Sequence, residues 1–482
     1  MDTEVLTFAD RLREIAAAHG WSLEILANMT GYKSRTSVSR VLQERSSHKN
    51  RLNFFKSLCD CGALSREEES GLRKALDVSL IGKDKANARQ IFRALILGDE
   101  ENAPDPPNLA RLLDTLRAAK EARLLVVNCL HEHFFACLRD LLYEKKGHSA
   151  RHYCALEAGE SEAANVMYCL SRMTYLPNYA AFVCERDARG GNTLPGLDML
   201  CATMEESDGS RTDVLALFSD ASNVAVHRIP AEYGLFSFIE RALLQAMTCA
   251  EPATQLCSSQ EGPESFVNIM SYWAECERNR DMYHVKSDLC VNNIPTQYLR
   301  SCLNERELLR FFPTLDLETL RAMKEKLLYF QLQRYKNMYE SKNPKHLILT
   351  MDGLRDFAAT GMTSEHFVAM RPFTVRERIA ILEDLQTRVS ESQFFFLYFF
   401  KESFRPRFEI NCWDGYGMTA FPILKEERAD NYCNNVIFHP RMVSAFREYF
   451  MEDLRKNQTI STAERNAFLR ALIDMLKAQI DD

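Results

Sequence analysis

The stretch from Trp21 to Leu42 constrains the fold of this 482-residue chain most, because it predicts two short helices joined by a tight turn. Ser22 can cap the free backbone N–H groups of the first helix with its hydroxyl. Gly31 suits the turn, since glycine accepts a positive φ without a steric clash. The buried face of the first helix would be apolar: Leu23, Leu26 and Ala27. The stretch therefore indicates two helices held at a fixed angle.

The second helix would begin at Ser34 and would present a polar face to solvent. Its inward stripe would consist of Val38, Val41 and Leu42. Its outward face would carry small hydroxyls and guanidinium groups: Arg35, Thr36, Ser37, Ser39 and Arg40. Such side chains hydrogen-bond to base edges and to phosphate oxygens. The pattern therefore favours contact with nucleic acid.

Positive charge is concentrated around the same stretch. Between Gly31 and Phe55 the basic residues are opposed by a single acid, Glu44. The whole chain, in contrast, has a formal net charge of -7. The basic residues are Lys33, Arg35, Arg40, Arg45, Lys49 and Arg51. A local basic patch on an acidic protein is typical of a surface that meets phosphates.

This arrangement resembles the helix-turn-helix domain of the Cro and phage-repressor class, also called the xenobiotic response element family of bacterial transcription regulators. The resemblance covers residues 1–60. It rests on the Ala27, Gly31 and Val38 core, on a recognition helix from Ser34 to Arg40, and on a basic loop from Lys49 to Arg51. It implies binding of double-stranded DNA through Ser22, Lys33, Ser34, Arg35, Thr36, Ser37, Ser39, Arg40, Lys49, Asn50 and Arg51. Because one such unit covers only a few base pairs, we expect a homodimer.

Two features depart from the family pattern. The turn between Gly31 and Val38 is one residue longer than usual, and Leu42-Gln43-Glu44 replaces the Glu-x-Gly that commonly closes the recognition helix. Docking on DNA would then be slightly rotated. The same residues are also compatible with a small helical bundle that binds another protein.

Further helices would complete a domain over residues 1–80. A helix from Thr3 to His19 has apolar residues spaced i, i+4, i+7 and i+8. A fourth helix would lie around Phe55, and Ser65 opens a fifth with a capping-box pattern. We therefore predict a five-helix, lambda-repressor-like domain. Residues 81–107 would form a linker helix, Lys85–Leu97, and an acidic, proline-containing joint, Gly98–Pro107.

The middle region, residues 108–250, predicts an α/β domain. Arg123 to Cys129 is a continuous apolar run with valines, which suits a buried strand. Helices are expected at Leu109–Lys120, His131–Glu144 and Phe236–Met247. Further strands are expected at Ala150–Leu156, Asn178–Glu185, Leu197–Met204, Val214–Ser219 and Val224–Ile229. The alternation of strand and helix indicates a central sheet.

The third region, residues 260–482, predicts a mainly helical domain with a small β insert, so the whole chain would be mainly α with α/β. Its helices are expected at Leu317–Tyr339, Thr374–Val389 and Arg441–Leu454. The insert would consist of strands at Phe394–Phe400, Arg407–Cys412 and Val436–Phe438, with a turn from Trp413 to Gly417. No period of about 34 or 40 residues supports a helical repeat array.

The composition is typical of a folded cytoplasmic protein. Its 46% hydrophobic and 10% aromatic residues can fill real cores. No apolar run approaches the roughly 18 residues that span a bilayer, and the first four residues lack the basic start of a secretion signal. The 15 cysteines have no framework spacing. We therefore expect reduced cysteines and no membrane contact.

Catalytic and metal-binding motifs are mostly missing. The densest His/Cys cluster, His131, His133, Cys137, His148, His152 and Cys154, has spacings that match no common zinc site. His284-Val285-Lys286 begins like the H-x-K motif of phospholipase D-type phosphodiesterases, but the required aspartate is replaced by Val291. Glu402, Glu409 and Asp414 are interpreted as solvated loop acids. We therefore predict no metal, no cofactor and no enzymatic activity.

Aromatic side chains of the β insert could line a ligand pocket or fill a thin core. We take Trp413 and Tyr416 as candidate contacts of a small-molecule or peptide effector. The sequence thus predicts a one-component transcription regulator with a DNA-binding head and a large sensing or oligomerisation module. The alternative is an enzyme or toxin-like module that uses such a head for targeting or autoregulation.

Overall fold

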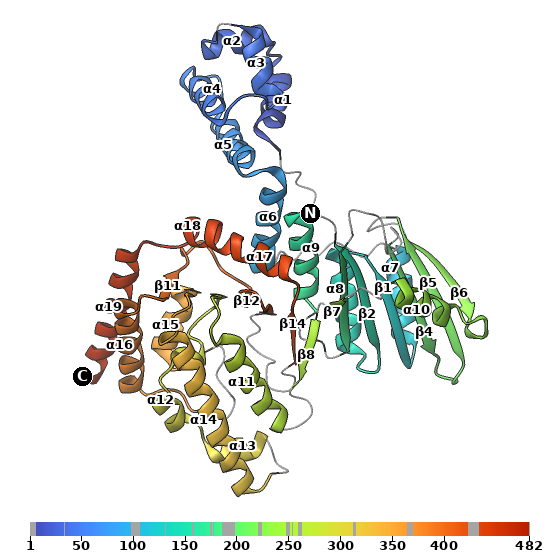
Figure 1. Ribbon diagram of the computed structural model, residues 1–482, viewed down its shortest axis with the longest axis vertical. Coiled ribbons are helices and arrows are strands. Elements are labelled where there is room, and N and C mark those ends of the chain that lie inside the picture. Colours follow the sequence, from blue (N-terminus) through green and yellow to red (C-terminus); the bar gives the residue numbers. More distant parts are fainter. Residues whose placement is uncertain are drawn as a thin grey trace. The chain divides into compact units, whose positions relative to one another are not determined.

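The structure is a computed structural model (Figure 1). It describes residues 6–32, 34–97, 107–130, 132–156, 159–173, 176, 178–185, 198–219, 224–246, 251–252, 254–258, 263–311, 315–363, 370–422 and 433–481. The chain divides into two compact units. The N-terminal unit comprises residues 1–91 with 159–161, and the C-terminal unit comprises residues 92–158 and 162–482. The predicted joint from Gly98 lies outside the described residues up to position 106.

The N-terminal unit is helical. Its helices are α1 (Phe8–His19), α2 (Leu23–Thr30), α3 (Arg35–Leu42), α4 (His48–Asp60) and α5 (Arg66–Ile81), and α6 (Lys83–Leu97) begins in it. Each of α1 to α5 follows a hydroxyl side chain that accepts a hydrogen bond from a backbone N–H of the first turn: Thr7, Ser22, Ser34, Ser47 and Ser65. The capping box predicted at Ser65 is confirmed.

An apolar core holds these helices together. Helix α1 packs on α3 and α5, and α2 packs on α3 and α4. Phe8, Val38 and Phe54 are fully buried. Leu26 and Ala27 are buried as predicted, but the prediction for Leu23 is wrong, because this first residue of α2 is 37% exposed. The core therefore stops one turn short of the start of α2.

The segment predicted as a basic loop is the first turn of a helix. The Ser47 hydroxyl accepts a hydrogen bond from the Asn50 N–H at 3.3 Å, and α4 starts at His48. Lys49, Asn50 and Arg51 are therefore helical. The loop prediction is wrong because Ser47 caps a helix directly in front of these polar residues. As a result, basic side chains lie at the positive end of a helix dipole.

The first of two seven-stranded sheets in the C-terminal unit has the order β6-β5-β4-β1-β2-β3-β7. Its strands are β1 (Glu121–Val127), β2 (Ser149–Leu156), β3 (Tyr179–Glu185), β4 (Asp198–Glu205), β5 (Arg211–Phe218), β6 (Val224–Pro230) and β7 (Glu251–Pro252). The associated helices are α7 (Pro107–Ala118), α8 (Glu132–Glu144), α9 (Glu160–Ser171), η1 (Ala231–Tyr233) and α10 (Leu235–Ala246). The predicted α/β character of this region is confirmed, although α9 and β7 were not predicted.

The second sheet has the order β11-β10-β9-β12-β13-β14-β8. Its strands are β8 (Thr254–Ser258), β9 (Met282–Val285), β10 (Lys345–Leu349), β11 (Phe395–Phe399), β12 (Phe408–Trp413), β13 (Gly417–Pro422) and β14 (Cys433–Ile437). The predicted small β insert is therefore wrong in extent, because β8, β9 and β10 extend it to a full sheet.

The remaining helices belong to the same region of the chain as the second sheet. They are α11 (Pro263–Glu277), η2 (Val291–Asn293), α12 (Thr296–Cys302), α13 (Glu305–Phe311), α14 (Leu317–Tyr339), α15 (Met351–Thr360), α16 (Val375–Glu391), α17 (Pro440–Tyr449), η3 (Phe450–Leu454), α18 (Arg455–Asn457) and α19 (Thr462–Asp481). The predicted helix at Leu317–Tyr339 matches α14 in full. Helices α11 and α14 pack closely on each other.

The two sheets repeat one design. In the first, β1, β2 and β3 run parallel, and β4, β5 and β6 continue antiparallel from the other side of β1. In the second, β9, β10 and β11 run parallel, and β12, β13 and β14 continue antiparallel from β9. Only the outermost short strand differs, since β7 pairs with β3 and β8 pairs with β14. Strands β9 and β12 therefore hold the places of β1 and β4.

The cysteines for which the structure describes a state are free thiols, most of them buried, as predicted for small apolar residues. Within the described ranges, no helix combines the length and the apolar character needed to cross a bilayer. In the same ranges, no group of three or more His, Cys, Asp or Glu side chains is placed to hold a metal ion.

Candidate functional site

The turn between α2 and α3 is fixed by backbone hydrogen bonds. Gly31 has a φ of +69°, and its N–H donates to carbonyl oxygens of the last turn of α2. The Tyr32 N–H then donates to the Ala27 carbonyl at 3.0 Å. The left-handed glycine predicted at this position is confirmed. The angle between α2 and α3 is thus set by the backbone and not by side-chain packing alone.

Helix α3 presents polar side chains. Arg35, Thr36 and Arg40 are exposed, whereas Ser37 and Ser39 are half-buried. The exposed Ser34 side chain accepts a hydrogen bond from the Ser37 N–H at 3.2 Å, and the two hydroxyls are 3.0 Å apart. Ser34 therefore serves first as the cap of α3. The side chains of α3 that can contact another molecule are therefore those of its first turn and of its solvent-exposed face.

Arg35 forms an ion pair with Glu24 of α2. Both side chains are about two-thirds exposed, at 66% and 61%. An exposed pair of this kind contributes roughly 0–1 kcal/mol to stability, so it can open at low cost. A guanidinium carries five N–H donors, and a single carboxylate oxygen leaves most of them available.

The start of α4 lies beside this unit. The Tyr32 hydroxyl donates a hydrogen bond to the Asn50 carbonyl at 3.0 Å, which ties the turn to α4. Lys49 and Asn50 are exposed. Arg51 is half-buried, and its Nε has no hydrogen-bond partner within the described part of the chain. Lys33 lies outside the described residues.

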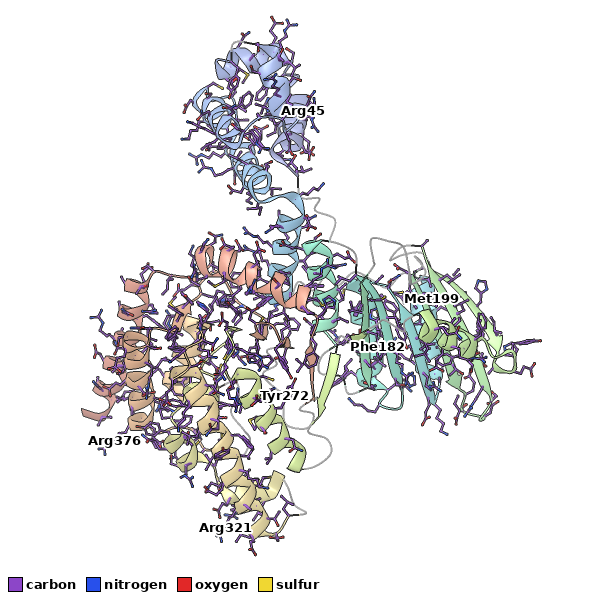
Figure 2. The ribbon with its side chains drawn as sticks, in the orientation of Figure 1. Arg45, Phe182, Met199, Tyr272, Arg321 and Arg376 are labelled. Carbon is purple, nitrogen blue, oxygen red and sulfur yellow. The ribbon has the colours of Figure 1, made fainter. Side chains whose placement is uncertain are left out.

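Basic side chains also follow α3. The Arg45 N–H donates to the Arg40 carbonyl at 2.9 Å, and the Arg45 side chain is exposed on the N-terminal unit (Figure 2). Arg13 of α1 donates a hydrogen bond to the Leu42 carbonyl at 2.7 Å and so holds the end of α3. The structure therefore brings the predicted residues of α3 and α4 onto one unit, with Ser22 apart as the cap of α2.

A second group of functional candidates lies on one side of the second sheet. Asn411 of β12 pairs in register with His284 of β9. Alternation of side chains along a strand places Lys286 and Glu409 on the same side, two residues further along. Lys345 of β10 pairs in register with Met282, which is two residues before His284, so Lys345 lies on the same side. We call His284, Lys286, Lys345, Glu409 and Asn411 the polar face, and all five side chains are buried.

Glu409 is saturated by hydrogen bonds. Its Oε2 accepts from the Lys286 ammonium at 3.2 Å, and both side chains are at most 3% exposed. Its Oε1 accepts from the Ser287 N–H at 3.2 Å and from the Ser287 hydroxyl. The interpretation of Glu409 as a solvated loop acid is therefore wrong, because β12 is a central strand of a full sheet.

The turn after β9 is tightly held. The Thr350 hydroxyl donates to the Ser287 carbonyl at 2.6 Å. A Cβ atom added to Gly353 would lie 1.9 Å from that carbonyl oxygen, so only glycine fits there. The start of α15 thus holds the Ser287 carbonyl in place, through the Thr350 hydroxyl and the close approach of Gly353.

His284 has no hydrogen bond at either ring nitrogen among the described residues, although its side chain is only 1% exposed. Its ring meets that of Trp413 edge-on, with centroids 6.3 Å apart. Burial lowers the pKa of His284 well below its usual value, and the cations of Lys286, Arg334 and Lys345 lower it further. The imidazole is therefore neutral at pH 7.

A second buried ion pair lies between α11 and α14. Arg334 donates to one oxygen of Glu277 through Nε at 2.9 Å and through Nη2 at 2.8 Å. The other carboxylate oxygen has no hydrogen-bond partner in the described structure. Lys345 donates to two backbone carbonyls, and burial lowers its pKa to about 8. The polar face thus adjoins further buried charge.

The first sheet offers a contrast at its own buried histidine. His152 Nδ1 bonds to the Tyr179 hydroxyl at 2.8 Å, and Nε2 bonds to the Asn128 carbonyl at 2.6 Å. Both nitrogens are occupied, so the side chain has a structural role. In the predicted His/Cys cluster, His148 likewise bonds to the Leu116 carbonyl at 2.9 Å. His131 lies outside the described residues.

The two predicted effector contacts lie near the end of β12. Trp413 is 1% exposed and belongs to the hydrophobic core that includes the second sheet. Its Nε1 has no hydrogen-bond partner in the part of the chain described. Tyr416 is half-buried, and its hydroxyl lies 2.7 Å from that of Tyr272 on α11. The Arg280 guanidinium covers the Tyr416 ring at 4.4 Å.

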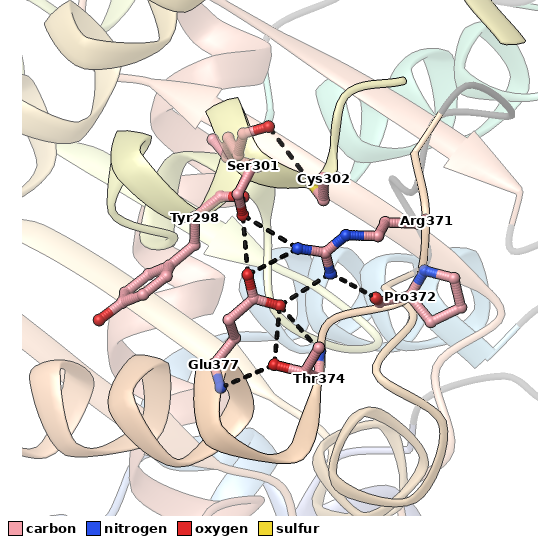
Figure 3. Close-up of polar contacts among 8 residues, drawn as sticks. Tyr298, Ser301, Cys302, Arg371, Pro372, Thr374 and Glu377 are labelled. Carbon is pink, nitrogen blue, oxygen red and sulfur yellow. Dashed lines mark hydrogen bonds and ion pairs between the residues drawn. The ribbon is translucent and has the colours of Figure 1, made fainter. Parts of the chain in front are cut away.

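A polar cluster at the start of α16 is structural. Arg371 donates two hydrogen bonds to Glu377, both at 2.8 Å, and the Ser301 hydroxyl donates to the same carboxylate at 2.7 Å (Figure 3). Glu377 also accepts from the Thr374 N–H and completes a capping box. These bonds saturate the carboxylate, so we assign it no functional role.

Sequence reasoning missed most of the polar face. The sequence-based prediction names only Glu409 and the H-x-K pair, and it connects neither with the other. The available signal was the spacing Glu-x-Asn at 409–411 on a predicted strand, since alternate residues share a face. Nothing in the sequence pairs that strand with His284.

Comparisons with known proteins leave the family open. No protein-family model matches the chain, and no curated protein matches it. Among solved structures, polyphosphate kinase from Porphyromonas gingivalis has a TM-score of 0.22 at 12% identity, over 77% of this chain and 53% of that one. Phosphatidylserine synthase from Haemophilus influenzae has a TM-score of 0.23 at 10% identity, over 83% of this chain and 98% of that one. Likenesses this distant carry no argument about function.

Proposed function

We propose that this protein is a bacterial-type, one-component transcription regulator whose N-terminal unit binds operator DNA. The observation that supports the proposal most is the α2–turn–α3 unit, in which a fixed turn presents an exposed polar helix. Helix α3 would enter the major groove with its N-terminal end towards the bases. Arg35 and Thr36, together with Ser37, would then reach base edges.

Phosphate contacts would come from Arg40 and from the first turn of α4. The Lys49 ammonium is exposed there, and the free N–H groups of a 13-residue helix point in the same direction as its positive dipole end. Arg51 and Asn50 lie in the same turn. Phosphate contacts position a protein on DNA and carry no sequence information.

The C-terminal unit would sense a ligand and hold two copies of the chain together. A homodimer with two heads about 34 Å apart would read a two-fold symmetric operator. An effector that binds one arrangement of the heads better than another would shift DNA affinity, with typical coupling of about 1–3 kcal/mol. The expected location is the cytoplasm.

A DNA titration tests the proposal. Full-length protein is used to select binding sites from fragmented genomic DNA, and the affinity for the selected site is compared with that for a scrambled duplex at fixed salt. A specific site bound at least about 10³-fold more tightly than the scrambled duplex supports a regulator. Equal affinities would remove the function.

A second function class, an enzyme with a DNA-binding head, is favoured by one observation. His284 is a buried, neutral imidazole beside Lys286 and Glu409. Buried titratable groups with shifted pKa values gather at catalytic sites. A hydrolase screen of the wild type and of His284→Gln tests this class, and activity that is absent from the variant supports it.

A further inference from the structure

Asp84, in the first turn of α6, accepts hydrogen bonds from the first turn of α9. Its Oδ2 accepts from the Glu160 N–H at 2.6 Å. Its Oδ1 accepts from the Ser161 N–H at 3.2 Å and from the Ser161 hydroxyl. The Lys85 ammonium also lies 3.3 Å from the Glu160 carboxylate. Residues 76 and 77 positions apart in the chain thus hold the starts of two helices together.

The cap of α9 comes from another helix. The first backbone N–H groups of a helix lack partners within it, and a side chain directly in front of the helix usually supplies one. Helices α1 to α5 follow that rule. Gly159 precedes α9 and has no side chain, and a Cβ atom added to it would lie 3.2 Å from Asp84 Oδ1. The Asp84 carboxylate therefore takes the place of a capping side chain at residue 159.

Both helices joined by Asp84 continue from the N-terminal unit into the C-terminal unit. Asp84 and residues 159–161 belong to the N-terminal unit, whereas α6 from Phe92 and α9 from Glu162 belong to the C-terminal unit. Phe92 is fully buried, and its ring stacks on that of Tyr449 with centroids 5.3 Å apart. The later residues of α9 are buried too: Ala163, Ala164, Val166, Met167, Tyr168, Cys169, Leu170 and Ser171. Packing therefore holds the later parts of both helices, whereas Asp84 at the start of α6 is exposed.

A single glycine separates α6 from the helices of the proposed DNA-binding head. Gly82 lies between the last residue of α5 and the first residue of α6, with a φ of +90° that favours glycine. Its N–H donates to the Val78 carbonyl at 2.9 Å, and its carbonyl accepts from the Ala86 N–H at 3.0 Å. One residue therefore ends α5 and begins α6. A change in its φ and ψ would turn helices α1 to α5 relative to α6.

The contact at Asp84 has a strength that allows it to open. Removal of a capping side chain typically changes a folding equilibrium by about 2- to 30-fold, so an open form would make up roughly 3–30% of the molecules. The ion pair of Lys85 and Glu160 adds little to this, because 41% and 34% of the two side chains are exposed. Any molecule that binds one of the two forms better shifts the balance between them.

We propose that Asp84 is a latch. When closed, it joins the starts of α6 and α9. When open, it frees the first turn of α6, so that the head connected through Gly82 can change its orientation. The inference rests on the proposed function and names its regulatory element. With the latch closed, the two heads of a dimer have less freedom to lose on binding two half-sites, so the operator is bound more tightly.

Hydrogen exchange of the full-length protein tests the latch without DNA. Mass spectrometry of peptides that contain residues 159–162 reports on the N–H groups of Glu160 and Ser161, which hydrogen bonds to Asp84 protect. Asp84→Ala is expected to speed this exchange by about 2- to 30-fold. Exchange in the buried later part of α9 should not change. Asp77→Ala is the matched control, because Asp77 is an exposed aspartate on α5, and it should exchange as the wild type does.

A second variant approaches the latch from α9. Glu160→Pro removes one N–H donor to Asp84, and proline suits the first position of a helix, so α9 can still form. Exchange at Ser161 is expected to rise as in Asp84→Ala. Glu160→Gln keeps the N–H group and loses only the ion pair with Lys85, so its exchange should stay close to that of the wild type. Wild-type exchange rates in both Asp84→Ala and Glu160→Pro would overturn the latch.

The regulatory role is tested by the affinity for DNA. Asp84→Ala is expected to bind the two-half-site operator about tenfold less tightly and a single half-site as tightly as the wild type, because α3 and α4 are unchanged. Faster exchange with an unchanged operator affinity would overturn the regulatory role. Wild-type protein without specific DNA binding would contradict the proposed function, whereas the exchange rates still support or contradict the latch itself.

Discussion

Arg35 is the residue on which base reading in the proposed function depends most. It lies in the first turn of α3, and its pair with Glu24 is exposed and weak. Arg35→Ala is therefore expected to cost about 1–3 kcal/mol of binding to the operator and to relax discrimination at one base pair. Anisotropy titrations on the operator and on single-base variants measure both effects.

Arg11→Ala is the control for Arg35→Ala, because Arg11 likewise pairs with a glutamate, Glu14 on α1, with 34% and 50% of the two side chains exposed. Its operator affinity should equal that of the wild type. Equal losses for Arg35→Ala on operator and on random DNA would contradict a base-reading role.

Lys49 is the cleanest test of the phosphate contacts. Its side chain is exposed, whereas half-buried Arg51 also packs on the unit, so Arg51→Ala would change more than one interaction. Lys49→Ala is expected to weaken binding to all DNA sequences alike and to reduce the slope of log affinity against log salt by about one. A variant that loses affinity only for the operator would show that Lys49 reads a base.

At the residue scale, short sequence patterns predict the role of some residues and not of others. Ser22, Gly31 and Ser65 act as predicted, because caps and turns depend on a few neighbouring residues. Glu409 was misread because its partner Lys286 is 123 positions away in the chain. No local pattern reports such a pair.

At the element scale, Glu377 links the start of α16 to its surroundings. The hydrogen bonds from Arg371, and then those from Thr374 and Ser301, lower the pKa of Glu377 to about 2. Because this pKa lies below the usual value of 4.5, the carboxylate stabilises the fold above pH 4.5 and loses this effect as the pH falls through about 2. The stability gap between wild type and Glu377→Gln should therefore shrink between pH 5 and pH 2, as followed by urea unfolding.

Glu383 on the same helix provides the control for this pH dependence. It pairs with Lys477 at 2.7 Å, but both side chains are about half exposed. Glu383→Gln should change stability by less than about 1 kcal/mol at every pH. A pH-independent gap for Glu377→Gln would contradict the assigned role of its carboxylate.

At Gly353, α15 approaches the turn after β9 too closely for any larger side chain. A Cβ added to Gly353 would meet a backbone oxygen that is itself held by Thr350, so neither side can move aside easily. Gly353→Ala is expected to destabilise the C-terminal unit by about 1–3 kcal/mol or more. In Gly147→Ala the nearest atom belongs to the flexible Glu121 side chain, at 3.3 Å, so chemical unfolding of that variant should differ little from the wild type.

Elements with clear periodicity were predicted well, and short buried strands were not. Helix α14 has 23 residues, and its pattern persists over many turns. Strands β9 and β10 have four and five residues and are buried on both faces, so they show no alternation. His284 and Lys345 further interrupt their apolar character. A full sheet was therefore read as a small insert.

At the scale of the whole molecule, the proposed dimer has a direct test. Full-length protein is expected to sediment as a dimer at micromolar concentration. Its footprint on operator DNA should show two half-sites about 34 Å apart. A monomer that protects a single half-site with 1:1 stoichiometry would contradict the proposed assembly.

The repeated strand order has a consequence for how this chain can vary. Two copies of one sheet design allow one copy to serve as scaffold while the other retains selected polar positions. Substitutions among apolar residues of similar volume are tolerated best, whereas each member of a connected polar network restricts the others. Relatives of this chain should therefore drift fastest in the strands from residue 121 to 230. They should change least at the five polar positions between residues 284 and 411.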